Sequence, residues 1–153
     1  MKRSLFLLAV TLIFLTACGR EEDYQVYHRF ADRTWFRFNI LQFEIPVKKS
    51  DKPVDVVFFA RHDRNYPFDS LAFNMVMTSP SGEERIRECR LKIRDKSGNF
   101  LGTFAGDSCE VTFVLRREMV IDRDGKLTVE LENLVPRMRT TGLYGAGIRL
   151  KKP

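Results

Sequence analysis

The side chains best suited to nucleophilic or metal chemistry are few in this chain of 153 residues: two histidines, His28 and His62, and three cysteines. A metal site needs three or four converging ligands, and neither an HxH nor an HxxxH spacing joins the histidines. His62 stands beside Asp63, but the sequence has no G-x-S-x-G elbow and no phosphate-binding glycine motif. Two carboxylates across a cleft could hydrolyse a glycoside, and sequence spacing does not exclude that. We nevertheless expect no enzyme, no metal ion and no cofactor.

The thiol of Cys18 has the clearest chemical context. Two basic residues and the apolar run 4–15 precede it, and that run is shorter than the ~20 apolar residues that span a bilayer. Leu15-Thr16-Ala17-Cys18 resembles a bacterial lipobox, in which lipid is attached to the cysteine thiol. The sequence therefore predicts a removed signal peptide over 1–17 and a covalent lipid on Cys18. The alternative is a chance cysteine after an ordinary signal peptide.

A short acidic tether, residues 18–23, follows the predicted cleavage site. Gly19 stands second in the mature chain, where Asp commonly retains enterobacterial lipoproteins at the inner membrane, so we expect the outer membrane. Glu21, Glu22 and Asp23 resemble the signals that export lipoproteins of the Bacteroidetes to the cell surface, or they form a solvated linker. The choice between the periplasmic and the exposed face stays open.

Composition limits the rest of the chain. Removing 17 of 153 residues leaves 136, enough for one core, so residues 24–153 are predicted to form a single domain. The formal charge of +6 falls to +4 when Lys2 and Arg3 leave with the signal peptide. Because the basic residues alternate with apolar ones and form no dense patch, we expect no nucleic-acid binding.

Cys89 and Cys109 are the remaining cysteines if Cys18 carries lipid. An exported protein meets oxidising conditions, and the two lie in strand-like runs that could be neighbours, so a disulfide is one expectation. Two free thiols are the other, because the pairing depends on a strand register that sequence does not fix.

Alternation of apolar and polar residues, with a period of two, dominates the mature chain. Turn signals separate the alternating runs at intervals of roughly 8–15 residues. The pattern predicts an all-β fold: an antiparallel β-sandwich of about eight or nine strands, with a jelly roll as one form it could take. The segments near 116–119 and 134–139 could each hold a helical turn.

The most individual stretch is ARHDRNYPFDSLAFNMVM, residues 60–77. Its charged loop is a candidate for gripping a partner or stacking on a sugar. The candidate residues are Arg61, His62, Arg64, Asn65, Tyr66 and Phe68. The favoured alternative is that Tyr66 and Phe68 fold inward and close one end of the sandwich. For Trp35, the single tryptophan, burial in a strand is favoured.

Several motifs, taken together and in order, resemble one family. The lipobox, Trp35, RHDRNYPFDSL at 61–71, SGNFLG at 97–102 and GAGIRL at 145–150 look like the GldH family of gliding-motility lipoproteins. The likeness covers nearly the whole mature chain. Phe100 stands where that family usually has Trp, and Ser70 where Asn commonly precedes Leu.

The resemblance implies a non-enzymatic lipoprotein of the Bacteroidetes envelope. It implies partners among the proteins of the gliding and type IX secretion machinery and contact with the membrane through the lipid. It carries over no catalytic residue. A surface glycan-binding lipoprotein module is the alternative function, and it depends on the exposure of Tyr66 and Phe68. A carrier of an apolar ligand is a third, less suited to so phenylalanine-rich a chain.

Overall fold

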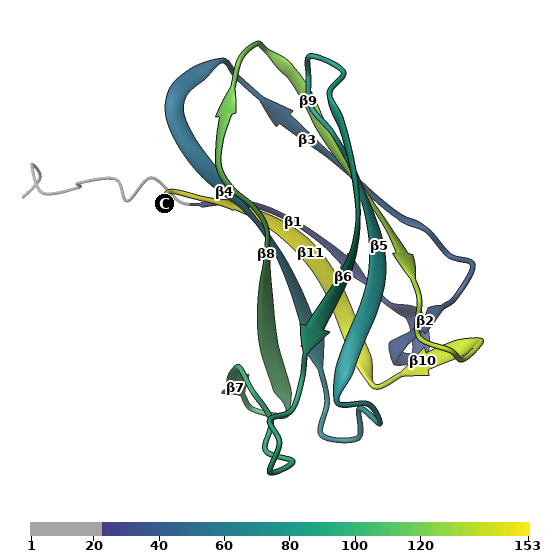
Figure 1. The fold of residues 1–153 in the computed structure, drawn as a ribbon. Helices are drawn as coiled ribbons and strands as arrows, with labels where there is room; N and C mark the ends of the chain where they lie inside the picture. The colour runs from purple at the N-terminus through teal and green to yellow at the C-terminus, as the bar shows by residue number, and fades with distance from the viewer. Residues whose placement is uncertain (1–22) are drawn as a thin grey trace, which may run out of the picture.

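The computed structural model describes residues 23–153, whose regular secondary structure consists of strands and one short 3-10 turn, Ala31–Arg33 (Figure 1). The predicted signal peptide, Cys18 and most of the tether lie outside the described residues. The eleven strands of this part are β1 (Tyr24–Arg29), β2 (Thr34–Phe36), β3 (Leu41–Val47), β4 (Ser50–His62), β5 (Ser70–Thr78), β6 (Glu84–Lys92), β7 (Thr103–Ala105), β8 (Ser108–Ile121), β9 (Gly125–Asn133), β10 (Arg139–Thr141) and β11 (Leu143–Lys151).

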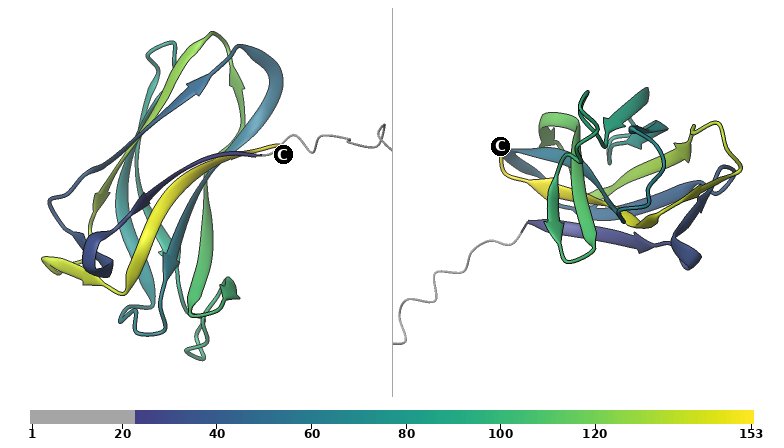
Figure 2. Two further views of the ribbon diagram at one scale, coloured as in Figure 1. Left: turned by 180° about the vertical axis from the view of Figure 1, so that it is seen from behind. Right: turned by 90° about the horizontal axis from the view of Figure 1, so that it is seen from below.

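Two antiparallel sheets pack face to face. One has the order β1-β11-β4-β8-β7 and the other β3-β9-β5-β6, while β2 and β10 form a separate two-stranded ribbon. Figure 2 shows β11 running alongside β1, with which it pairs from Tyr24–Leu150 to Arg29–Gly145. The predicted all-β sandwich is confirmed. The strand number exceeds the prediction because β2, β7 and β10 are only three residues long and leave almost no alternating pattern.

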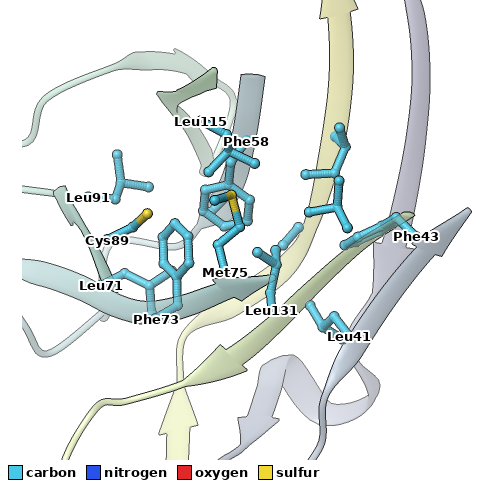
Figure 3. Close-up of a cluster of buried hydrophobic side chains, with 14 of the residues drawn as sticks. Leu41, Phe43, Phe58, Leu71, Phe73, Met75, Cys89, Leu91, Leu115 and Leu131 are labelled. Carbon is cyan, nitrogen blue, oxygen red and sulfur yellow. The ribbon is translucent and has the colours of Figure 1, made fainter. Parts of the chain in front are cut away.

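The inward residues of both sheets make one apolar core (Figure 3). In β3, buried and exposed residues alternate, so Leu41, Phe43 and Ile45 face inward. Phe73 of β5 meets Phe58 of β4 across the layers with ring centroids 4.6 Å apart. Full burial of a large aromatic side chain contributes about 2–3 kcal/mol, so this contact holds the sheets together.

The two predicted helical turns are wrong. Residues 116–119 belong to β8, where the register against β4 shifts and Glu118 adopts a φ of 49°, which bends the strand. Residues 134–138 lead from β9 to β10 without a helix, and Pro136 removes an amide donor there. Among the described residues, no helix is long and apolar enough to cross a membrane.

Candidate partner-binding site

The loop between β4 and β5, predicted as a partner-binding loop, places its main aromatic side chain inside the protein. Tyr66 is fully buried, and its hydroxyl donates to the carbonyl of Ser70 at 3.1 Å. Burial raises the pKa of Tyr66, with Arg94 opposing it. Phe68 packs edge-on against Tyr66 at 5.9 Å and is partly buried. Tyr66 therefore folds inward, as the favoured alternative predicted. Because its ring is buried, it cannot stack on a sugar.

The β10–β11 turn closes over this loop. The amide of Asp63 donates to the carbonyl of Gly142 at 2.9 Å, and the Asp63 carboxylate accepts the amide of Asn65 at 2.8 Å. A Cβ on Gly142 would come within 2.9 Å of the Tyr66 Cα, and the φ of Gly142 is +81°. Glycine is needed here both for the backbone angle and for the close approach. Arg33 adds an ion pair to Asp63 at 3.3 Å.

Arg94 fixes the other side of the loop. Its guanidinium donates to the carbonyls of Tyr66 at 2.8 Å and Phe68 at 3.3 Å. It also lies 4.3 Å from the centre of the Phe100 ring. Charged donors to backbone carbonyls make stronger bonds than neutral ones, so the loop conformation is held from both ends. The loop is thus chiefly a structural closure of the sandwich.

His62 ends β4 inside this closure. Its Nδ1 lies 2.8 Å from the carbonyl of Asp63, which only accepts, so Nδ1 carries the proton. Nε2 is then a buried acceptor without a partner among the described residues. Burial lowers the pKa of His62, and Arg94 adds to this, whereas the carbonyl and carboxylate of Asp63 oppose it. The ring is neutral at physiological pH.

Cys109 pairs with His62 across the β4–β8 ladder, which places a thiol and an imidazole side by side. Burial raises the pKa of Cys109, and its thiol donates to the carbonyl of Leu101 at 3.2 Å. An activated cysteine needs the opposite, a lowered thiol pKa beside an accessible base. Both residues are fully buried. The pair as it stands is core packing.

Cys89 and Cys109 are free thiols, and the expected disulfide is not formed. Their strands are not neighbours: β6 pairs with β5 in one sheet, and β8 pairs with β4 and β7 in the other. The Cys89 thiol lies 3.8 Å from the carbonyl of Arg87, whereas the Cys109 thiol contacts a different carbonyl, that of Leu101. The register that sequence left open places the two in opposite layers of the core.

Arg61 lies outside the loop, on the outer face of the five-stranded sheet. Glu110 accepts from Arg61 at 3.0 Å and from both terminal nitrogens of Arg149 at 3.1 Å. Burial by itself would raise the pKa of Glu110, but the hydrogen bonds from Arg149 and Arg61 outweigh it, and the pKa is lowered. The two guanidinium groups cover Phe59, which is fully buried on this face.

Of the six predicted loop residues, only Arg64 and Asn65 are exposed. Arg64 rests on the Phe104 ring at 4.3 Å. Arg61 and Phe68 are half-buried, and His62 and Tyr66 are not accessible. Contact between this loop and a partner protein stays a prediction, and the residues free to make it are the exposed Arg64 and Asn65. The glycan-binding alternative loses the exposed Tyr66 on which it depended.

A different surface exposes apolar side chains, and sequence reasoning missed it. We call it the apolar corner; its members are Phe36 (46% exposed), Phe38 (77%), Ile40 (57%) and Met138 (61%). The amide of Arg37 donates to the carbonyl of Met138 at 3.1 Å, which joins the two segments that carry these side chains. In FRFNI, residues 36–40, apolar and polar residues alternate as in a strand with one buried face. However, β2 ends at Phe36, and the residues after it are exposed.

Buried groups beneath the apolar corner hold it in place. Trp35 is fully buried as predicted, stacks on Phe30 at 5.5 Å, and donates from Nε1 to the carbonyl of Asn39 at 2.8 Å. Buried Asn133 donates to the hydroxyl of Thr140 at 2.8 Å and to the Trp35 carbonyl at 3.3 Å. The corner is therefore a fixed surface and not a frayed loop.

The rim of the apolar corner is basic. Segments 34–41 and 134–143 carry Arg37, Arg137 and Arg139, all exposed, and no acidic residue. Arg139 lies 5.6 Å from the centre of the Phe36 ring. Aromatic residues, methionine and arginine are the types enriched where proteins bind one another. Within residues 23–153, no group of three or more His, Cys, Asp or Glu side chains is placed to hold a metal ion.

Fold and surface together define a β-sandwich with an exposed apolar and basic contact surface. The sequence profile of the GldH lipoprotein family matches residues 22–150. The chain belongs to the GldH lipoprotein family.

Named relatives agree with this membership. The chain is 23% identical to the gliding motility lipoprotein GldH of Flavobacterium johnsoniae, over 86% of this chain and 79% of that protein. It is 20% identical to the gliding motility lipoprotein GldH homolog of Christiangramia forsetii, over 97% and 95%. Among solved structures, a chain of infectious bursal disease virus Gx strain gives a TM-score of 0.32 at 11% identity, over 86% of this chain and 31% of that one.

Proposed function

We propose that this protein is an outer-membrane lipoprotein that acts as a non-enzymatic structural or assembly component of the gliding-motility and type IX secretion machinery. Family membership supports the link to gliding, and the apolar corner is the observation that carries the assembly role. Exposed apolar patches of this kind, rimmed by polar residues, mark binding surfaces on soluble domains.

The path of β1 supports a role at a distance from the anchor. Tyr24 begins β1 beside Leu150, and the strand runs to Arg29, after which the chain continues through Phe30 and the 3-10 turn into β2. Six residues of strand span ~20 Å. Figure 1 shows the β2–β10 ribbon well away from the C-terminal end of β11, where β1 starts. A lipid on Cys18 would thus hold one end of the domain while the apolar corner faces a partner.

Gene deletion followed by complementation tests this function. Spreading on agar and secretion of type IX cargo are measured in the deletion strain, and both are expected to fall. Wild-type protein restores them, whereas the double variant Phe38→Ser with Met138→Ser restores neither. Both side chains are mostly exposed, so the variant keeps its stability within about 0.5 kcal/mol per substitution.

Val120→Ser is the matched control, because Val120 is 52% exposed on β8, outside the apolar corner. It is expected to restore both phenotypes. Immunoblots of the outer-membrane fraction check that all variants reach equal levels. Normal spreading and secretion in the deletion strain would contradict the function itself, and full complementation by the corner variant would contradict the role of the corner.

A further inference from the structure

The two sheets are open toward solvent along one side. β6 is the outer strand of its sheet, and β7 covers β8 only from Ser108 to Glu110. Beyond that point β8 has no hydrogen-bonded neighbour strand on its outer side among the described residues. Unpaired amide and carbonyl groups along such an edge are a template for another strand.

A groove follows this open edge of β8. It has a volume of about 690 Å³ and is lined by the consecutive residues 112–118 together with Arg85 and Arg87 of β6. A second hollow of about 440 Å³ shares Thr112 and Phe113 with it and continues toward Gly102. Consecutive residues of one strand thus line the groove, as expected of a groove that takes a strand.

Arg87 is an exposed residue of β6 that lines the groove and reaches across it to β8. Its Nη2 donates to the carbonyl of Leu115 at 2.9 Å and approaches that of Val114 at 3.4 Å, and its guanidinium lies 5.6 Å from the centre of the Phe113 ring. Within residues 23–153 it makes no ion pair with a carboxylate. A positive charge without a counterion in a groove favours an anionic occupant.

The other three arginines of the groove have only two carboxylates between them as ion-pair partners. Arg85 and Arg116 share a single carboxylate, Glu83, at 2.9 Å and 3.7 Å. Arg117 reaches Asp55 only at 3.9 Å. The lining includes four arginines and one glutamate, Glu118; with the paired carboxylates Glu83 and Asp55 counted, the groove keeps a surplus of one positive charge (4 − 3 = 1).

We infer that this groove binds an extended, acidic segment of another protein, which adds as a short strand to the open edge of β8 beyond β7. Carboxylates of the segment pair with the groove arginines and draw Arg87 away from the Leu115 carbonyl, and the backbone of the segment pairs with β8. The bulge at Glu118, whose amide is held by the Asp55 carboxylate at 2.8 Å, ends the pairing surface. A second copy of this chain would bring the same basic edge and be repelled, which selects a partner of opposite charge. The inference does not depend on the apolar corner or on the proposed function.

Fluorescence anisotropy with the full-length chain in detergent micelles tests the binding. The probe is a labelled peptide of about ten residues in which threonine alternates with glutamate, a length typical of strands. The acidic probe is expected to bind, with affinity falling as NaCl is raised. A probe with lysine in place of glutamate is expected not to bind. Failure of the acidic probe, or equal binding of the lysine probe, overturns the inference.

Variants locate the site. Arg85→Glu combined with Arg87→Glu should weaken the acidic probe by about tenfold or more, since charge-assisted contacts are lost. Arg87→Gln removes only the charge, in a shorter polar side chain at an exposed position, so it guards against a result due to misfolding, and it should also weaken the acidic probe. Arg123→Glu is the matched control, because Arg123 is exposed in the β8–β9 turn. Unchanged binding by the groove variants would place the site elsewhere.

Hydrogen exchange separates strand addition from adsorption by charge. With the acidic probe bound, the outward amides of Thr112–Leu115 should exchange more slowly, while those in the β10–β11 turn should not change. Binding without protection on β8 overturns strand addition. Dimerisation of the chain alone, seen by light scattering and abolished by Arg87→Gln, would make a second copy the occupant and overturn the proposed partner.

Discussion

His62 is held as a neutral ring by its surroundings. Nδ1 donates to the carbonyl of Asp63, Nε2 has no partner within residues 23–153, and the ring lies 5.0 Å from Phe100 and 5.6 Å from Tyr66. Because its folded-state pKa is lowered below 6.5, the folded protein takes up this proton less readily than the unfolded chain. The associated stability is fully present above pH 6.5 and is lost as pH falls through the folded-state pKa. The slope for one proton is at most about 1.4 kcal/mol per pH unit.

His62→Phe should therefore flatten the dependence of unfolding free energy on pH below 6.5. Urea unfolding at several pH values between 7.5 and 5 measures it. His28→Gln, at an exposed position, should keep the wild-type slope. If His62→Phe and wild type lose stability in parallel as the pH falls, the neutral-ring assignment is wrong.

Trp35 and Tyr66 differ in how far the sequence alone predicts their burial. Burial of Trp35 follows from its type and place in the chain, and the structure confirms it. For Tyr66 the sequence allowed both an inward and an outward side chain, because the decision rests with Gly142 and Arg94, which lie 76 and 28 positions away. Contacts between such distant positions depend on strand order, which alternation alone does not determine.

At the scale of elements, long alternating runs were predictable and short ones were not. β3 and β5 show their buried face directly in the sequence. FRFNI carries the same alternation yet forms most of the apolar corner, because Phe36 ends a three-residue strand whose pairing partner within residues 23–153 is the equally short β10. The open edge of β8 could not be predicted either, since it follows from the shortness of β7 rather than from β8 itself.

The β4–β5 loop, residues 63–69, is held by one distant side chain, Arg94. Arg94→Ala removes two charge-assisted bonds to the carbonyls of Tyr66 and Phe68, and its side chain is only 19% exposed. The unfolding free energy should fall by about 2–3 kcal/mol. The loop amides on either side of Pro67, 63–66 and 68–69, should exchange faster, as native-state hydrogen exchange would detect.

Arg90→Ala is the matched control, because Arg90 makes an exposed bond to the Ser70 hydroxyl at 3.2 Å. It should change stability by no more than about 0.5 kcal/mol. Faster exchange spread evenly over the sandwich in Arg94→Ala, instead of confined to the loop, would show that Arg94 supports the whole core and not this element.

At the scale of the whole molecule, the two exposed surfaces lie toward opposite edges of the five-stranded sheet. The apolar corner continues from β1 and β11, whereas the groove follows β8, with β4 between them. Sites so separated and without shared partners behave additively. With both surfaces occupied as proposed, one domain would contact two proteins at once, in keeping with the proposed assembly role.

The proposed assembly role needs an anchor at the membrane, and the sequence predicts that this anchor is a lipid on Cys18. Cys18→Ser should abolish incorporation of labelled palmitate and move the chain out of the detergent phase in a phase-partition assay. More than one acyl chain is needed for stable anchoring, at ~0.8 kcal/mol per buried CH₂, so losing the thiol should remove the anchor entirely. Phe38→Ser should keep both the label and the detergent partition, because it alters a surface of the folded domain alone. Label retained by Cys18→Ser would refute lipidation at this residue and with it the predicted N-terminus of the mature protein.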